Sequence, residues 1–204
     1  MSYRRLLPWI VLTAVAGLAA GALVARMLAQ KSPALQSGTW LPEAHELAPF
    51  RLTDLDGRAF GNAELQGHPS LLFFGFSNCP DICPTTLATL SALQSRAPLP
   101  GLRVVFITVD PERDTPAVLK AYLAAFSGAF IGLYGGNELL APLMRSVGSI
   151  AARQPQADGS YTVDHSATLY LLDSRGRMAA VFTPPYTAAA LEADLLAMAR
   201  AGAL

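Results

Sequence analysis

Two cysteines, Cys79 and Cys83, are the residues whose type and spacing point most directly to chemistry. They are the only cysteines in the 204-residue sequence, and they lie in the stretch Cys79-Pro80-Asp81-Ile82-Cys83. Secreted disulfide scaffolds carry more cysteines in shorter chains, and a disulfide across so short a loop would stabilise the fold little. The pair therefore indicates a local redox or metal site. A three-residue spacer allows the two sulfurs to bond to each other or to share one ion.

Each cysteine precedes a proline, and the residue before a proline is disfavoured in helical geometry. Pro84 suits the first position of a helix, so we expect a helix over residues 85–94 with both cysteines on the loop at its start. The partial positive charge of a helix N-terminus favours the thiolate form of cysteine. Thiolates bind metal ions and also attack disulfides, so the spacing leaves metal binding and disulfide exchange both open.

Alternating strand and helix patterns predict the core that positions this pair. Residues 70–76 and 103–109 are short apolar runs typical of strands buried on both faces. A second helix is expected over residues 115–126, with Asp114 and Thr115 as candidate caps. The order strand, helix, strand, helix implies a parallel core.

Hairpins and two further helices complete the predicted domain. Asp56-Gly57 predicts a turn between residues 50–53 and 59–60, and residues 173–176 predict a turn between strands over 161–172 and 178–182. The remaining expected elements are a strand over 130–134 and helices over 137–147 and 187–201. Together these elements predict an α/β fold over residues 41–204, with a thioredoxin-like mixed sheet flanked by helices.

The amino-terminal part carries an uncharged run, LLPWIVLTAVAGLAAGALV, over residues 6–24. A transmembrane helix needs about 20 apolar residues, so residues 1–29 are expected to form a membrane anchor. Residues 30–40 hold prolines and polar residues without periodicity and are expected to form a tether. A cleaved signal peptide is the alternative, although the run exceeds the usual length of its apolar region.

Charges around the run suggest an orientation for this anchor. Two arginines precede the run, and Arg26 and Lys31 follow it, so the positive charges on its two sides are nearly equal. The charge of the free amino terminus then favours an orientation with the amino terminus inside. We therefore expect a single pass through the inner (cytoplasmic) membrane, with the globular domain in the periplasm or an equivalent exported compartment.

Composition excludes one class of partner. Lys plus Arg and Asp plus Glu balance at 15 each, so no basic field is present to hold a nucleic acid. Hydrophobic residues make up 52% of the sequence, which is ordinary for a globular protein and too many for a disordered one.

Three stretches resemble the Sco/SenC family of copper metallochaperones for cytochrome c oxidase assembly. They are FSNCPDICPTT from Phe76, VDPERDTP from Val109 and YTVDHSA from Tyr161. They occur in the order expected for the family, and the similarity runs from about Pro42 to the end of the sequence.

The resemblance implies a membrane-anchored, thioredoxin-like protein that binds copper through Cys79, Cys83 and His165. It also implies an upstream copper donor and delivery of copper to the CuA-bearing subunit of cytochrome c oxidase, or reduction of the CuA cysteines before loading. Without the family resemblance, His165 is a lone histidine on a strand-like run. A histidine in such a run is more often packed or hydrogen-bonded than bound to a metal. Two thiolates and an imidazole suit copper, as Cu(I) or Cu(II), because soft sulfur selects Cu(I) and nitrogen tolerates Cu(II).

Three other functions compete with copper delivery. A thiol-disulfide oxidoreductase would use the same cysteines to reduce partner cysteines and would not need His165. A peroxidase of the peroxiredoxin type would need a Thr or Ser where Pro80 stands. A membrane-tethered docking domain would need neither cysteine. The sequence therefore favours a metallochaperone and leaves a reductase activity open.

Overall fold

A computed structural model of the chain describes residue 9 and residues 12–21 and 34–204. The chain divides into two units, Met1–Ser32 and Pro33–Leu204. Residues 12–21 of the first unit are helical. Among the residues described, no helix is both long and apolar enough to cross a membrane. Much of the expected anchor over residues 1–29 lies outside the described residues, so the anchor stays a prediction.

The second unit is built on one eight-stranded sheet, whose order is β1-β10-β9-β4-β5-β6-β2-β3. Its strands are β1 (Gly38–His45), β2 (Arg51–Asp54), β3 (Ala59–Gly61), β4 (Ser70–Gly75), β5 (Arg103–Thr108), β6 (Ile131–Tyr134), β9 (Leu169–Leu172) and β10 (Met178–Phe182). Strands β4, β5 and β6 run parallel, whereas β9 runs antiparallel to β4. The prediction of a mixed sheet is confirmed.

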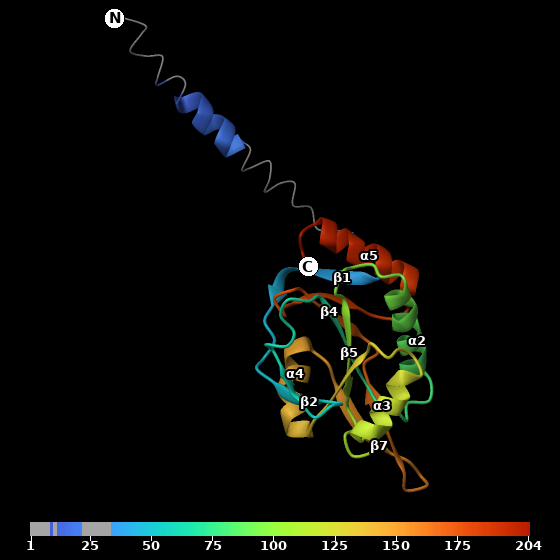
Figure 1. The fold of residues 1–204 in the computed structure, drawn as a ribbon. Helices are drawn as coiled ribbons and strands as arrows, with labels where there is room; N and C mark the ends of the chain where they lie inside the picture. Colours follow the sequence, from blue (N-terminus) through green and yellow to red (C-terminus); the bar gives the residue numbers. More distant parts are fainter. Residues whose placement is uncertain (1–8, 10–11, 22–33) are drawn as a thin grey trace, which may run out of the picture. The chain divides into compact units, whose positions relative to one another are not determined.

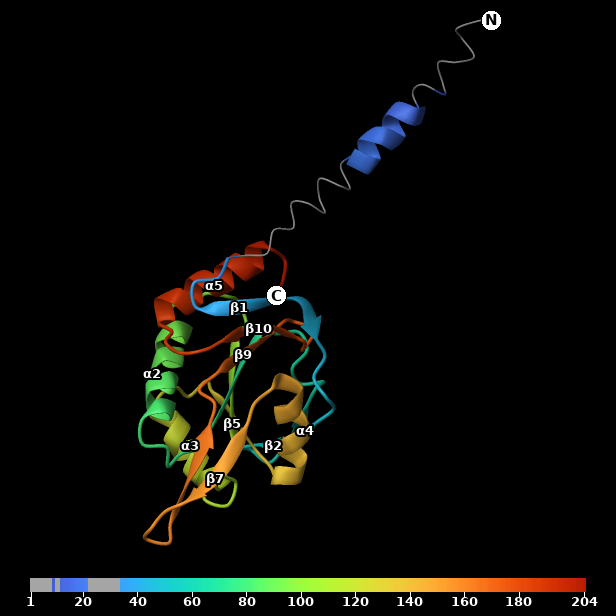
Figure 2. The same cartoon turned by 180° about the vertical axis from the view of Figure 1, so that it is seen from behind.

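Four helices cover the two faces of this sheet. They are α2 (Ile82–Ser95), α3 (Pro116–Ala124), α4 (Asn137–Val147) and α5 (Ala188–Arg200). Helices α2, α3 and α5 lie on one face and α4 on the other (Figures 1 and 2). The flanked sheet of the prediction is therefore also confirmed.

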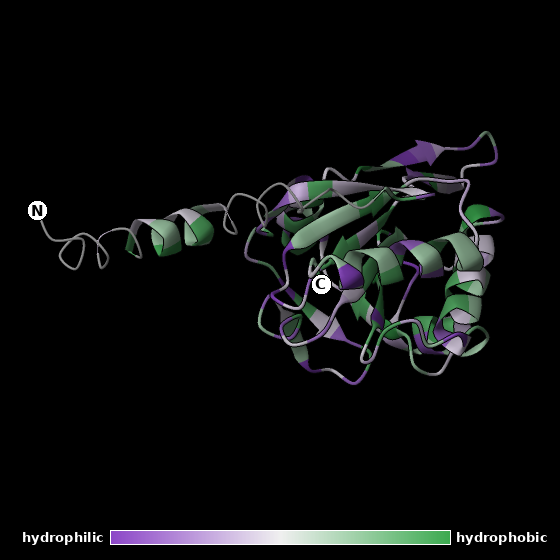
Figure 3. Cartoon of the chain, turned by 90° about the horizontal axis from the view of Figure 1, so that it is seen from above, coloured by the Kyte–Doolittle hydropathy of each residue, from purple (hydrophilic) through white to green (hydrophobic). Residues whose placement is uncertain are grey.

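Strand β4 lies at the centre of the core. Leu71 and Phe73 pack toward α2, α3 and α5, while Leu72 and Phe74 pack toward α4. A strand covered on both faces has no solvent side, which explains its continuous apolar sequence. The central strands are accordingly coloured hydrophobic in Figure 3.

Helix α2 begins earlier than the sequence predicts. Asp81 is its N-cap and Cys83 lies in its first turn, so the prediction that both cysteines lie on a loop is wrong for Cys83. The first four N–H groups of a helix have no partner within it, so Pro84 is tolerated inside the first turn. Cys79 does lie on the loop before the helix.

The predicted strand over residues 161–172 is two strands in different sheets. Strand β8 (Tyr161–His165) pairs with β7 (Ala151–Pro155) in a separate two-stranded sheet, whereas β9 belongs to the main sheet. Ser166 and Thr168 break the run, because the Thr168 N–H donates to Ser166 Oγ at 3.2 Å and forms a local turn. Strand β7 was not predicted, since it is mostly exposed and does not alternate.

The second unit also begins before Leu41. Strand β1 starts at Gly38, inside the segment expected to be a tether. The N–H groups of Gln36 and Ser37 donate to the buried Asp194 carboxylate of α5 at 2.6 and 2.9 Å. Residues 36–40 are therefore bound to the globular unit.

Candidate metal centre

Cys79, Cys83 and His165 converge at one point. One ligand atom of each, two Sγ atoms and an imidazole nitrogen, lie within 4.8 Å of one another. The Cys83 Sγ and the His165 Nε2 are 3.2 Å apart, although the two residues are 82 positions apart in sequence. Neither cysteine forms a disulfide. The structure thus places the histidine where the sequence alone could not.

The loop that carries Cys79 follows β4 and is held from the end of β5. The Cys79 N–H donates to the Phe76 carbonyl at 3.3 Å, and the Ser77 N–H donates to the Asp114 carboxylate at 3.1 Å. Asp114 is buried and accepts a second bond from the Thr108 hydroxyl at 2.6 Å. Asp114 was a candidate helix cap, but its carboxylate fixes the cysteine loop instead.

Cys83 lies deeper than Cys79, fully buried between α2 and the sheet. A Cβ built on Gly75, the last residue of β4, would lie 2.8 Å from the Cys83 Sγ and 2.9 Å from the Phe106 ring. Glycine at this strand end therefore lets the sulfur approach the backbone, where a larger residue would displace it.

The His165 ring has a defined orientation. Its Nδ1 lies 3.1 Å from the Ser166 carbonyl oxygen, which can only accept, so Nδ1 carries the proton. Nε2 then presents its lone pair toward Cys83. Phe73 and Phe76 pack edge-on against the ring, with centroids 6.1 and 5.6 Å away. A backbone partner on the second nitrogen is the usual arrangement of a metal-binding histidine.

His165 sits at the end of the β7–β8 hairpin, and Arg113 attaches this hairpin to the body of the domain. The Arg113 Nη1 donates to the Tyr161 carbonyl at 2.9 Å, and its guanidinium stacks 3.9 Å from the centre of the Tyr161 ring. Arg113 Nε also bonds to the fully buried Asp110 carboxylate, which accepts from the Tyr161 hydroxyl at 2.8 Å. We call Asp110, Arg113 and Tyr161 the hairpin latch.

Sequence reasoning missed the latch as a positioning device. The available signal was an acid and a base three positions apart, Asp110 and Arg113, directly after the buried strand β5. Nothing in that pattern identifies Tyr161 as the partner, because Tyr161 is 51 positions beyond Asp110.

The two sulfurs share one proton unequally. A hydrogen bond donated by the Cys83 thiol lowers the pKa of Cys79 to about 4. The same bond to Cys79, together with burial, raises the pKa of Cys83. The free pair is therefore a Cys79 thiolate and a Cys83 thiol, and a metal bound by both sulfurs must displace the Cys83 proton.

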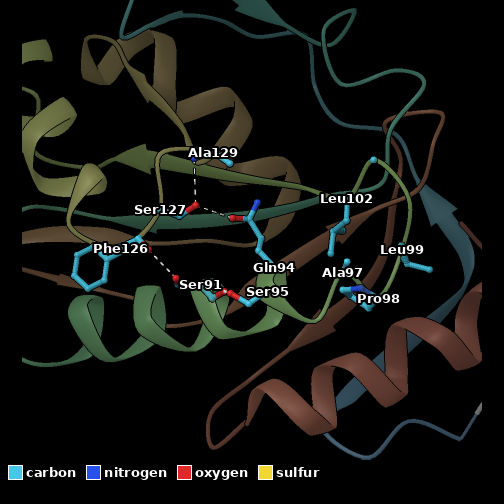
Figure 4. A pocket seen from close by; sticks show the side chains of 11 residues that line it. Ser91, Gln94, Ser95, Ala97, Pro98, Leu99, Leu102, Phe126, Ser127 and Ala129 are labelled. Atoms are coloured by element: carbon cyan, nitrogen blue, oxygen red, sulfur yellow. Dashed lines mark hydrogen bonds between the residues drawn. The ribbon is translucent and has the colours of Figure 1, made fainter.

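A separate cavity of about 490 Å³ lies at the opposite end of α2 (Figure 4). Its polar side chains already bond to protein groups. The Ser91 hydroxyl donates to the Phe126 carbonyl at 2.7 Å, and the Ser127 hydroxyl donates to Gln94 Oε1 at 3.0 Å. The cavity is remote from the cysteines because it lies at the other end of α2. The Ser91 and Ser127 hydroxyl protons are already used in bonds within the protein.

The chain matches the SCO1/SenC family over residues 40–200. This span is most of the chain and contains all three residues of the site, and the protein therefore belongs to the SCO1/SenC family. The resemblance found in the three sequence stretches is confirmed.

Curated relatives agree with this assignment. An SCO2-like protein of Rickettsia prowazekii is 41% identical over 133 residues, covering 63% of this chain and 65% of that protein. The mitochondrial protein SCO1 of Saccharomyces cerevisiae is 39% identical over 135 residues, covering 63% of this chain and 45% of that protein. The chain thus spans less than two thirds of the length of these relatives.

Solved structures of the family include copper-bound members. ScoI of Bradyrhizobium japonicum with copper bound is 41% identical, with a TM-score of 0.66, and the match covers 74% of this chain and 98% of that one. Yeast Sco1 with copper bound is 34% identical, with a TM-score of 0.69, covering 76% and 89%. BsSco, described as a member of the Sco family of cytochrome c oxidase assembly proteins, is 25% identical, with a TM-score of 0.63, covering 81% and 97%. The Cys-Cys-His cluster of this chain fits copper binding by its donor types.

The shared proton predicts a pH profile for alkylation of Cys79. Because the pKa of Cys79 is lowered to about 4, its reaction with iodoacetamide should change little between about pH 6 and pH 8, where an ordinary thiol gains about tenfold per pH unit. Cys83→Ala removes the donor and should restore a rising profile. A steep profile in the unsubstituted protein would contradict the shared proton.

The latch predicts which substitution frees the hairpin. Arg113→Lys cannot bond to both Asp110 and the Tyr161 carbonyl, and an isolated two-stranded hairpin is marginal in water. Amide hydrogen exchange in β8 should therefore accelerate about tenfold or more, while exchange in α5 stays unchanged. Arg58→Lys, in an exposed ion pair with Asp56, is the matched control. Equal exchange in both variants would show that the latch does not hold the hairpin.

Proposed function

We propose that Cys79, Cys83 and His165 bind one copper ion. The observation that carries this proposal is the convergence of two sulfurs and an imidazole nitrogen within 4.8 Å. Soft thiolates select Cu(I), and the imidazole allows Cu(II) to be held at the same place. With Cu(I), two thiolates and a neutral histidine leave one net negative charge, which the partly exposed position of Cys79 keeps in contact with water.

Copper leaves the site by ligand exchange with a docked partner. Cys79 is the more accessible of the two sulfurs, and Ile82, three residues further along the chain, is 41% exposed. A partner thiolate replaces Cys79 on the ion, while the buried Cys83 and His165 hold it until further partner ligands arrive. The protein then acts as a metallochaperone.

The recipient in this proposal is the CuA-bearing subunit of cytochrome c oxidase, after loading by an upstream copper donor. Support comes from family membership and from the description of BsSco as belonging to a family of oxidase assembly proteins.

A second function, reduction of partner disulfides, is supported by the Cys79 thiolate. Cys79 attacks one partner sulfur, forming a mixed disulfide and releasing one partner thiolate. Cys83, after losing its proton to solvent, attacks the Cys79 sulfur and releases the second partner thiolate. The partner disulfide gains the two electrons that the Cys79 and Cys83 sulfurs lose as their own disulfide forms. In this proposal the same chemistry prepares the CuA cysteines for copper.

The working location in this proposal is the outer face of the inner membrane, with a single N-in anchor over residues 6–24. Support comes from the uncharged sequence of that segment. Alkaline extraction should leave the protein in the membrane pellet, and external protease should digest its globular unit in spheroplasts. Release into the supernatant would contradict the anchor.

Copper binding predicts a clear difference between two histidine variants. The reduced full-length protein should bind one Cu(I) per chain in an anaerobic competition with a chromophoric chelator. His165→Ala should weaken binding about 10–100-fold or more, since a ligand is lost. His68→Ala, which removes a histidine outside the cluster, is the matched control and should bind normally. Equal affinities for the two variants would contradict the proposed site.

Oxidase assembly predicts a cellular defect. Cys83→Ser should lower cytochrome c oxidase activity to the level of cells that lack the protein, and added copper should restore it in part. His165→Ala separates the two functions, because a pure reductase retains activity without the histidine. Unchanged oxidase activity in Cys83→Ser cells would exclude the assembly role.

A further inference from the structure

The hydroxyl of Tyr186 lies in the loop between β10 and α5. It connects helix α2, which carries Cys83, to the turn that follows His165. It lies 2.8 Å from the Ala167 carbonyl oxygen and 3.2 Å from the Thr86 hydroxyl. Ala167 belongs to the turn after β8, whereas Thr86 belongs to α2. Helices α2 and α5 lie side by side in both views of the fold (Figures 1 and 2). A single side chain thus bonds to two segments that are distant in sequence.

The direction of these hydrogen bonds follows from counting protons. A carbonyl oxygen only accepts, so Tyr186 gives its one hydroxyl proton to Ala167. The Thr86 hydroxyl must then donate to the Tyr186 oxygen. Thr86 is buried, and the three groups form a directed chain in which each bond strengthens the next.

Both ends of this chain lie next to proposed copper ligands. Thr86 is three residues after Cys83 in α2, so the two side chains share one face of the helix. Ala167 is two residues after His165 and follows Ser166, whose carbonyl accepts the His165 Nδ1 proton. Fixing Thr86 to Ala167 therefore fixes the helix that carries Cys83 to the turn that orients His165.

This connection matters because the strand that carries His165 lies outside the main sheet. Strand β8 pairs with β7 alone in a separate two-stranded sheet. The hairpin latch holds β8 at Tyr161, its first residue, but nothing in the latch fixes the last residue, His165. Tyr186 supplies a restraint at that end.

We propose that Tyr186 is a positioning residue for copper binding: through Thr86 and Ala167 it sets the separation of His165 from Cys83. This inference rests on the proposed copper function. It goes beyond that function by assigning a role to a residue whose hydroxyl bonds to Thr86 and Ala167 and to none of the three proposed ligands.

The test is a double-mutant cycle on the full-length protein, read by Cu(I) affinity. Tyr186→Phe removes the hydroxyl and keeps the ring, and it should weaken Cu(I) binding about tenfold, the lower end of the range for lost supporting contacts at metal sites. In a His165→Ala background, the same substitution should have no further effect, because no histidine remains to be positioned. An equal loss of affinity in both backgrounds would mean a general structural role and would overturn the proposal.

A second readout reports on His165 without copper. In the free protein, ring nitrogen resonances of His165 should show one tautomer, with the proton on Nδ1, and Tyr186→Phe should shift them toward a tautomer mixture. Tyr134→Phe, which removes the hydroxyl of another partly buried tyrosine, is the control and should leave them unchanged. Identical spectra for both variants would overturn the proposal.

A second variant and the unsubstituted protein separate a failure of this inference from a failure of the proposed function. If Tyr186→Phe lowers the thermal midpoint strongly, Thr86→Val provides a second variant. It removes the donor to Tyr186, breaks the same connection at α2 and should also weaken Cu(I) binding. Normal Cu(I) affinity for both variants would overturn the inference alone. Failure of the unsubstituted protein to bind Cu(I) would overturn the proposed function itself.

Discussion

The site depends on one contact, between the Cys83 sulfur and the His165 Nε2, which are 3.2 Å apart. It joins a residue in the first turn of α2 to one at the end of a hairpin outside the main sheet. Neither element would bring its side chain to this point by local structure alone. The rest of the site can be understood as the set of interactions that keep these two groups together.

Those interactions come from three directions. Asp114 ties the Cys79 loop to the end of β5, the hairpin latch holds the beginning of β8, and Tyr186 joins the turn after His165 to α2. Each uses a buried or partly buried polar group, and such groups need satisfied partners to be stable in the interior. The segment from Asp110 to Asp114 thus supports both the cysteine side and the histidine side of the site.

The fold could be predicted wherever the signal is local. The apolar runs that became β4 and β5 and the Asp56-Gly57 turn are set by residues close in sequence, and the structure agrees with them. One error occurs where a distant contact decides. The run after Tyr161 divides because its two halves join different sheets. The start of α2 is a separate, local error, since Pro84 is tolerated inside the first turn and the helix begins before Cys83.

The same distinction applies to the site. The cysteine pair could be found from its spacing, but His165 came from family resemblance, because no local pattern reveals that a histidine 82 positions away meets a sulfur. The pairing of Arg113 with Asp110 left a local signal, but its bond to Tyr161 did not. The role of Tyr186 likewise exists only in the hydrogen bonds that it makes to distant segments.

X-ray absorption at the copper edge tests the central claim most directly, because it counts the atoms bound to the metal. The Cu(I)-loaded full-length protein should show two sulfur scatterers and one nitrogen scatterer, and His165→Ala should lose the nitrogen while keeping both sulfurs. A spectrum with sulfur alone in the unsubstituted protein, unchanged by His165→Ala, would contradict the account.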